Sequence, residues 1–516
     1  MPSTRWRDRA LRHGGWLVAA AYGLARWSLP PRAFNSHAIM YALVAVTRTH
    51  NALEWFHPLY PPLLVALSGL RAALGLSGEP LRALQALSLA GAMANLVLVH
   101  RLARRVSGDD RVALLAALLA TASINLWAWS MQTMPYTIAT ALVLWIADLA
   151  LASPRPGARR AALLGALTGA AACFDTTCAL AAVPLAADAV ALYGLGATLL
   201  PAAAFAGAFL ACLALGYLPL LLKLHALGGA LPHGLGEFMA SLPADIVPLG
   251  QSRSLAFQWG QFRASTAPVD APYWLMAAFL AFLSLGPGRD PRASPAFKRL
   301  IRLGSWFFAA AALFFFVSDP HNRFLYAAGL FVAPLAALAL ARRRDRAAWV
   351  ALLWLLLIGK NAAFPADYMP ARNPGFDEAR FVRAALSPRD LLIAASQPDW
   401  LFSYALDGKI PAVEVAWPRD AGDPFGYQRL PPGPRLNARI RATLCAKGRA
   451  LLAPDRVFRS SLITSADMDA HLTALQRSFQ GSFALGAPLV SPLGQRYYPL
   501  SLRPGGGAAC PGGARR

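Results

Sequence analysis

L-V-H-R-L-A-R-R-V-S-G-D-D-R-V-A-L-L-A-A-L-L-A-T, residues 98–121, places a basic cluster between two apolar segments. Its arginines are Arg101, Arg104, Arg105 and Arg111. Apolar segments of about 15–20 residues suit membrane-spanning helices, and arginines between spans gather on the cytoplasmic side. This stretch therefore predicts a cytoplasmic turn, and it sets the direction of the spans on either side.

The composition of the whole chain agrees with a membrane protein. Of its 516 residues, 56% are hydrophobic and only 15% are charged, which is too apolar for an ordinary soluble protein. The formal net charge of +23 comes from arginines that cluster between apolar blocks and do not line one face. Membrane topology explains that pattern better than nucleic-acid binding. We therefore predict a polytopic α-helical membrane protein with no nucleic-acid partner.

Extending this alternation along the chain predicts about eleven spans with a cytoplasmic N-terminus. Every strongly basic loop then lies on the cytoplasmic side, as the positive-inside tendency requires. The predicted spans are Trp16–Leu29, Leu81–Leu102, Val112–Trp129, Pro135–Leu151, Ala161–Phe174, Thr177–Leu192, Ala197–Leu222, Tyr273–Leu285, Leu303–Val317, Phe324–Leu340 and Trp349–Ile358.

Two segments allow a second interpretation. The first apolar run follows a basic start, as in a signal peptide, but we favour an uncleaved span, with Arg26 extending its head group to the membrane surface. The block Pro61–Leu76 is apolar but opens with two prolines and contains Arg71. A spanning helix there would place the basic cluster of residues 101–111 outside, so we predict an interfacial or re-entrant helix.

The composition changes near Ala363, where the predicted membrane domain, residues 1–362, ends. Short β-like runs at Leu391–Ala395 and Ala412–Trp417 alternate with helical patterns at Phe376–Leu386 and Met468–Phe479. Residues 363–503 are therefore predicted to form an extracytoplasmic α/β domain, and residues 504–516 a disordered end.

The five cysteines fall into two groups. Cys173, Cys178 and Cys212 lie in apolar blocks and are expected to be packing residues. Cys445 and Cys510 lie in the tail and could pair if it is outside the cytoplasm.

Two outward loops follow from the topology, residues 32–80, with interfacial helices, and residues 223–272. The first contains Glu54, beside Trp55 and Phe56, which could exclude water and raise the pKa of the carboxyl as a general base requires. His37 is a second candidate base or phosphate ligand. The alternative is that Glu54 is a solvated residue on an interfacial helix.

Other outward polar residues could bind substrate. Asp175 lies where one span leaves the membrane and the next enters, so it could face a polar cavity or cap the following helix. Arg323 and His321 lie at the outward end of two helices, and Lys360 at the end of the last span. These cations could bind a phosphate or serve as interfacial anchors. No cluster with metal-ligand spacing is evident, so no cofactor is predicted, although a divalent metal stays open.

Four stretches together resemble the membrane-embedded GT-C superfamily of glycosyltransferases, and in particular the bacterial branch of lipid A aminoarabinose transferases and protein mannosyltransferases. The resemblance covers roughly the first 360 residues. The four stretches are H-P-L-Y-P-P-L-L-V-A-L (57–67), the basic turn at 98–121, F-D-T-T-C-A-L-A-A-V-P-L (174–185) and H-N-R-F-L-Y-A-A-G-L-F-V-A-P-L-A-A-L-A-L (321–340).

This resemblance implies transfer of a sugar from a polyprenyl-phosphate donor, with an acidic base and cations on the departing lipid phosphate. The acidic residue usual early in the first outward loop is missing, since F-N-S-H-A-I-M-Y (34–41) has none. A second acidic position is also missing from M-Q-T-M-P-Y (131–136). Glu54 or His37 would have to replace the base, while Arg323, His321 and Lys360 are retained as cations.

The expected function is therefore transfer of a sugar to a glycan, lipid or protein of the cell envelope, on the extracytoplasmic face of the inner membrane. The missing carboxylates favour one alternative, a non-catalytic relative that binds a lipid-linked glycan or a partner. A transporter is less favoured, because there are no paired inverted halves.

Overall fold

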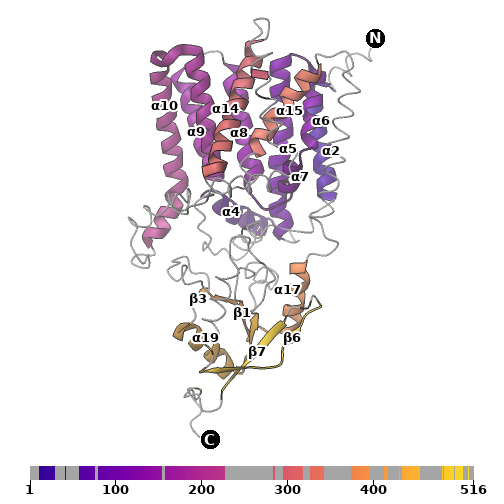
Figure 1. Ribbon diagram of the computed structural model, residues 1–516, viewed down its shortest axis with the longest axis vertical. Helices are drawn as coiled ribbons and strands as arrows, with labels where there is room; N and C mark the ends of the chain where they lie inside the picture. Colours follow the sequence, from indigo (N-terminus) through magenta and orange to yellow (C-terminus); the bar gives the residue numbers. More distant parts are fainter. Residues whose placement is uncertain are drawn as a thin grey trace. The chain divides into compact units, whose positions relative to one another are not determined.

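The computed structural model describes two compact units of the chain (Figure 1). The described helices at residues 11–28 and between residues 57 and 341 form the first unit, and a sheet with its helices between residues 374 and 503 belongs to the second. The described residues are 11–28, 41, 57–75, 80–153, 157–226, 280, 283–284, 294–317, 326–341, 374–394, 412–415, 429–430, 433–453, 479, 481–492, 494, 496–503 and 510.

The first unit is a bundle of helices. Its elements are α2 (Gly14–Ser28), α4 (Tyr60–Ala73), α5 (Pro80–Ser107), α6 (Asp110–Thr121), α7 (Ile124–Trp129), α8 (Tyr136–Ala152), α9 (Ala158–Phe174), the 3-10 helix η1 (Thr176–Ala181), α10 (Ala182–Ala226), α14 (Pro295–Val317) and α15 (Tyr326–Ala341). Among the described residues, two helical segments are long and apolar enough to cross a membrane, Leu84–Ser107 and Thr176–Pro219.

Most predicted spans in the described ranges coincide with a helix, and two differ in an informative way. The expected span Val112–Trp129 is divided into α6 and α7, because Ser123 is extended and its hydroxyl accepts a hydrogen bond from Leu126 N. The expected basic loop before Leu303 is helical from Pro295 onward, so Lys298, Arg299 and Arg302 lie on α14. Span Trp349–Ile358 and most of Tyr273–Leu285 lie outside the described residues.

Small residues bring α9 and α10 into backbone contact. A Cβ added at Gly165 would lie 2.1 Å from Phe205 O, and one at Gly169 would lie 2.8 Å from Phe209 O. One turn further, a Cβ at Gly216 of α10 would meet the Cys173 sulfur at 2.3 Å. Close backbone approach at such positions is the usual way in which small residues pack membrane helices. Within α10, Gly194 has φ 74° and joins two helices where the sequence predicts a turn between spans.

The second unit is built on one sheet. Its strands are β1 (Leu391–Ala394), β2 (Ala412–Val415), β3 (Arg429–Leu430), β4 (Ala450–Ala453), β5 (Phe483–Leu485), β6 (Leu489–Val490) and β7 (Arg496–Leu502). The order is β3-β2-β1-β4-β7-β5, with β6 also paired to β7. Strands β1 to β4 are parallel, and β7 runs antiparallel to β4, β5 and β6.

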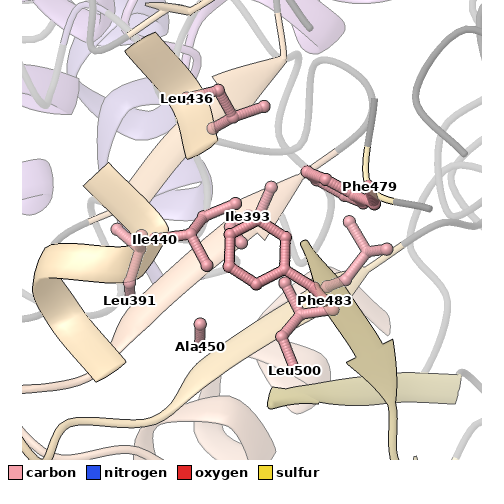
Figure 2. Close-up of a cluster of buried hydrophobic side chains, with 9 residues drawn as sticks. Leu391, Ile393, Leu436, Ile440, Ala450, Phe479, Phe483 and Leu500 are labelled. Atoms are coloured by element: carbon pink, nitrogen blue, oxygen red, sulfur yellow. The ribbon is translucent and has the colours of Figure 1, made fainter. Parts of the chain in front are cut away.

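Side chains of the sheet alternate between two apolar layers. Leu391 and Ile393 of β1 pack with Leu436 and Ile440 of α19 (Pro434–Cys445), in the cluster shown in Figure 2. Leu392, between them in the strand, packs in a separate cluster with Val382 and Leu386, at the end of α17 (Pro374–Ala385). Because successive strand residues point to opposite faces, the sheet is sandwiched between α19 and α17.

A disulfide links Cys445, at the end of α19, to Cys510. The three remaining cysteines are free, and Cys173 and Cys178 are buried, as expected of packing residues. A disulfide persists in oxidising compartments, and the extracytoplasmic location of this unit stays a prediction.

Candidate functional site

The bundle has two chemically different ends. At one end, which we call the ion-pair end, two buried aspartates each bind two arginines. Asp148 of α8 is fully buried and contacts Arg101 and Arg105 of α5, each at 2.8 Å. Asp188 of α10 is 3% exposed. It contacts the two arginines of α14 described next.

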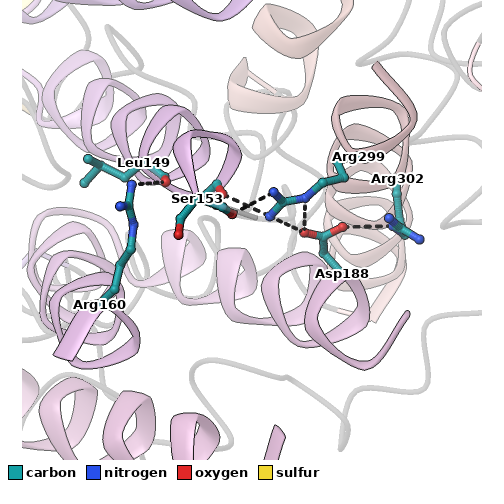
Figure 3. Close-up of polar contacts among 7 residues, drawn as sticks. Leu149, Ser153, Arg160, Asp188, Arg299 and Arg302 are labelled. Carbon is teal, nitrogen blue, oxygen red and sulfur yellow. Dashed lines mark hydrogen bonds and ion pairs between the residues drawn. The ribbon is translucent and has the colours of Figure 1, made fainter. Parts of the chain in front are cut away.

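Arg299 of α14 joins three helices at this end (Figure 3). Its Nη2 lies 2.8 Å from Asp188 Oδ2, and it also donates to the carbonyls of Ala150 and Ser153 at the end of α8, both at 2.9 Å. Arg302 Nε binds the other oxygen of Asp188 at 2.9 Å. Cations stabilise the carbonyl-rich C-terminus of a helix, so Arg299 stabilises the end of α8 as well as neutralising Asp188.

The opposite end, which we call the donor end, is polar but differently built. Here the start of α5 meets the turn between α7 and α8. Ser88 Oγ donates to Met134 O at 3.1 Å, and Thr137 Oγ1 donates to Ser88 O at 2.8 Å. Around this junction, the buried Gln85 Nε2, Trp129 Nε1 and Thr133 Oγ1 have no hydrogen-bond partner in the described part of the chain.

Unpaired donors of this kind call for an explanation. Gln85 is 1% exposed and Thr133 is fully buried. A buried polar group without a partner costs about 1–3 kcal/mol, and most such groups in native proteins are paired. A ligand or water that accepts hydrogen bonds would satisfy these three donors.

A buried cation lies at the same end. Arg26, near the end of α2, is 1% exposed and donates to Ser130 Oγ at 3.1 Å and Trp127 O at 3.0 Å. Its guanidinium also lies 3.9 Å from the centre of the Trp127 ring. The sequence interpretation, in which Arg26 extends to the membrane surface, is wrong. Serine, carbonyl and indole partners on α7 and just after it hold the guanidinium inside the bundle.

His57 ties the start of α4 to the end of α9. Its Nδ1 lies 2.6 Å from Phe174 O, and Leu59 N donates to Cys173 O at 3.1 Å. With Nδ1 donating to this carbonyl, a neutral imidazole carries its basic lone pair on Nε2. The His57 ring also meets the edge of Tyr136, 5.7 Å between ring centres, and Tyr136 contacts Trp129 at 4.8 Å. This chain of contacts places the α9–η1 turn at the donor end.

Asp175 is the one predicted site residue that the structure describes. Its Oδ1 accepts hydrogen bonds from Thr177 N at 3.0 Å and Thr177 Oγ1 at 2.7 Å, so it caps η1. Asp175 lies at the donor end, and the outward orientation of this end stays a prediction. The capping interpretation therefore holds, and a further role as a site carboxylate stays a prediction.

The other predicted site residues, Glu54, His37, Arg323, His321 and Lys360, lie outside the described residues. Within the described ranges, no group of three or more His, Cys, Asp or Glu side chains could hold a metal ion. Sequence reasoning missed Gln85, Thr133 and Trp129. Their one available signal was a polar residue near the end of an apolar segment, which many interfacial residues share.

Comparison with solved structures identifies the fold. ArnT from Cupriavidus metallidurans bound to undecaprenyl phosphate matches with a TM-score of 0.61 and 13% identity, over 95% of this chain and 98% of that one. The Archaeoglobus fulgidus oligosaccharyltransferase tethered to an acceptor peptide matches with a TM-score of 0.55 and 15% identity, over 96% and 74%. The chain therefore has a GT-C-like fold. No protein-family model and no curated protein sequence matches it.

Proposed function

We propose that this protein is a polytopic membrane glycosyltransferase that moves a sugar from a polyprenyl-phosphate donor to a cell-envelope acceptor on the extracytoplasmic face. The observation that carries the proposal is the GT-C-like fold along almost the whole length of the ArnT chain, whose structure contains undecaprenyl phosphate. About eleven spans, a cytoplasmic N-terminus and an extracytoplasmic α/β domain belong to the same proposal.

The donor end is the proposed site for the sugar. Sugar hydroxyls accept and donate hydrogen bonds, and they would satisfy Gln85 Nε2, Trp129 Nε1 and Thr133 Oγ1, which have no partner in the described ranges. A site whose buried polar groups need a substrate hydroxyl strongly rejects an analogue that lacks it. The donors would therefore select the sugar without any charged residue of their own.

The chemistry itself is assigned to residues of the first predicted outward loop and of the predicted outward ends of later spans. Glu54 or His37 takes the proton of the acceptor hydroxyl as that oxygen attacks the anomeric carbon. The bond from this carbon to the lipid phosphate breaks, and Arg323, His321 and Lys360 stabilise the departing phosphate. Asp175 would hold the α9–η1 turn beside this site.

The test is transfer by the full-length protein in liposomes, with a labelled polyprenyl-phosphate sugar and envelope extract. We expect labelled product, its loss in Glu54→Gln or His37→Ala, and weaker donor binding in Arg323→Ala. Transfer that survives both Glu54→Gln and His37→Ala would remove the proposed base. Absence of transfer with every class of donor would contradict the proposed glycosyltransferase activity.

One observation favours a second function. The carboxylate that the structure describes at the donor end, Asp175, is engaged in capping η1, and the sequence lacks the acidic residues usual for the family at 34–41 and 131–136. A non-catalytic protein that binds a lipid-linked glycan or a partner would need no base. It predicts donor binding that is weakened by Arg323→Ala, with no turnover.

A further inference from the structure

At the ion-pair end, the arginines of the buried ion pairs outnumber the aspartates that they contact. Four guanidinium groups, from Arg101, Arg105, Arg299 and Arg302, share the two carboxylates of Asp148 and Asp188. The side chains of Arg101, Arg105 and Arg302 remain 52%, 33% and 28% exposed, whereas that of Arg299 is 8% exposed. The surplus positive charge therefore lies on the accessible arginines.

Two of these arginines use only one edge of their guanidinium group. Arg105 binds Asp148 through Nε at 2.8 Å, and Arg302 binds Asp188 through Nε at 2.9 Å. Arginine has five N–H donors. Within the described part of the chain, no ion pair or hydrogen bond engages the two terminal nitrogens of either residue. Such a pair of nitrogens matches two oxygens of a phosphate.

Arg105 and Arg302 belong to the same end of the bundle. Ser294, which precedes α14, donates from its hydroxyl to Val106 O at the end of α5, at 3.5 Å. Arg159 of α9, also at this end, is exposed. In a chain that spans a membrane, a basic end of a helix bundle meets the head groups of one leaflet.

We propose that Arg105 and Arg302 bind the phosphodiester head groups of anionic phospholipids at the leaflet that faces the ion-pair end. Each head group accepts two hydrogen bonds from the terminal nitrogens of one arginine, while Nε keeps its aspartate. This lipid site is separate from the proposed sugar site, which lies at the donor end, and neither depends on the other.

The test measures the unfolding temperature of the purified full-length protein in detergent with phosphatidylglycerol, phosphatidylcholine or inorganic phosphate. A ligand that binds only the folded state raises this temperature. We expect a rise of several degrees with phosphatidylglycerol alone, reduced at least by half in Arg105→Gln/Arg302→Gln. The matched control Arg435→Gln/Arg439→Gln changes two exposed arginines of α19 and should keep the full rise.

A further variant distinguishes loss of lipid binding from loss of folding. Arg302→Lys keeps the charge near Asp188 but has no pair of terminal nitrogens, so we expect a smaller response to phosphatidylglycerol from a folded protein. An equal rise with phosphatidylcholine, or a full rise in the double variant or in Arg302→Lys, would overturn the proposal. An equal rise with inorganic phosphate would identify a free anion site and would overturn the lipid as its ligand.

Discussion

The two ends of the helix bundle bury polar groups according to opposite rules. At the ion-pair end, Asp148 and Asp188 are charged, and each has two arginine partners. At the donor end, Gln85 and Thr133 are neutral, and each has a buried donor atom with no hydrogen-bond partner within the described ranges. The first arrangement leaves nothing for a ligand to add to the aspartates, while the second leaves buried donor atoms unpaired among the described residues.

This difference distinguishes buried polar groups that stabilise the bundle from buried polar groups that are available to a ligand. An unpaired buried charge is too costly to keep, so complete pairing marks groups that hold helices together. Leaving a neutral donor unpaired costs less free energy. Such a donor can be kept where a hydrogen bond to a substrate offsets that cost. Substitutions at the two ends should therefore change different measurements.

The largest expected effect is at the ion-pair end. Asp188→Ala leaves Arg299 buried without its carboxylate, and removing one partner of a buried ion pair costs about 3–5 kcal/mol. We expect a strongly lowered unfolding temperature and little folded protein in membranes. The matched control is Asp110→Ala, which breaks the partly exposed Arg104–Asp110 pair and should cost about 1 kcal/mol. Equal losses in the two variants would contradict the bracing role of Asp188.

At the donor end, function should change while stability does not. Thr133→Val removes a buried hydroxyl without a partner, so we expect an unchanged or slightly raised unfolding temperature. If Thr133 binds the sugar, the loss of one hydrogen bond should cost about 1–3 kcal/mol, which lowers the transfer rate roughly 5- to 150-fold. Thr168→Val is the control, because Thr168 Oγ1 already donates to Leu164 O. Transfer that falls equally in both variants would argue against a sugar contact at Thr133.

A substitution that keeps the capping hydrogen bond can separate the capping role of Asp175 from a role of its carboxylate in the site. Asp175→Ala should cost about 1 kcal/mol through loss of the cap, whereas Asp175→Ser keeps a good capping oxygen. If capping is its whole role, Asp175→Ser retains both the unfolding temperature and transfer. A loss of transfer with normal stability in Asp175→Ser would assign the carboxylate to the site.

A partly exposed ion pair in the second unit should give the smallest effect, and one that depends on pH. Burial alone would raise the pKa of Asp390, but hydrogen bonds from Arg449 and Ser387 outweigh it and hold the pKa below its usual value. The unfolded chain then binds more protons in this window, so stability is present above the unfolded pKa of about 3.9 and is lost as pH falls through the folded pKa. Between pH 5 and pH 2, the free energy of unfolding of this unit should therefore fall less steeply with decreasing pH in Asp390→Asn than in the unchanged protein.

The helices were predictable because apolar length and basic turns act locally. Spans such as Pro135–Leu151 and Ala161–Phe174 reappear as α8 and α9 with small differences at their ends. The strands Leu391–Ala395 and Ala412–Trp417 reappear as β1 and β2. The start of α14 was not predictable, because the partners that allow Arg299 to be buried are distant in the chain, with Asp188 111 residues away.

The candidate site was less predictable for a related reason. Charged residues attract attention in a sequence, and so Glu54 and Arg323 became candidates, while Gln85 and Thr133 did not. Whether a neutral donor is paired depends on which helices meet around it, as at the junction of Ser88 with Met134. Arg26 shows the same limit, since its burial depends on Ser130 and Trp127.

The backbone contact between α9 and α10 has a mechanical consequence. At Gly165 and Gly169 no layer of side chains separates the helices, so no change of rotamer can absorb an added atom. A larger residue there would have to displace a whole helix. Arg160 lies near one end of α9, and Asp175 follows the other end. We therefore expect a larger residue at Gly165 or Gly169 to displace α9 as a rigid body and to shift the residues at both of its ends.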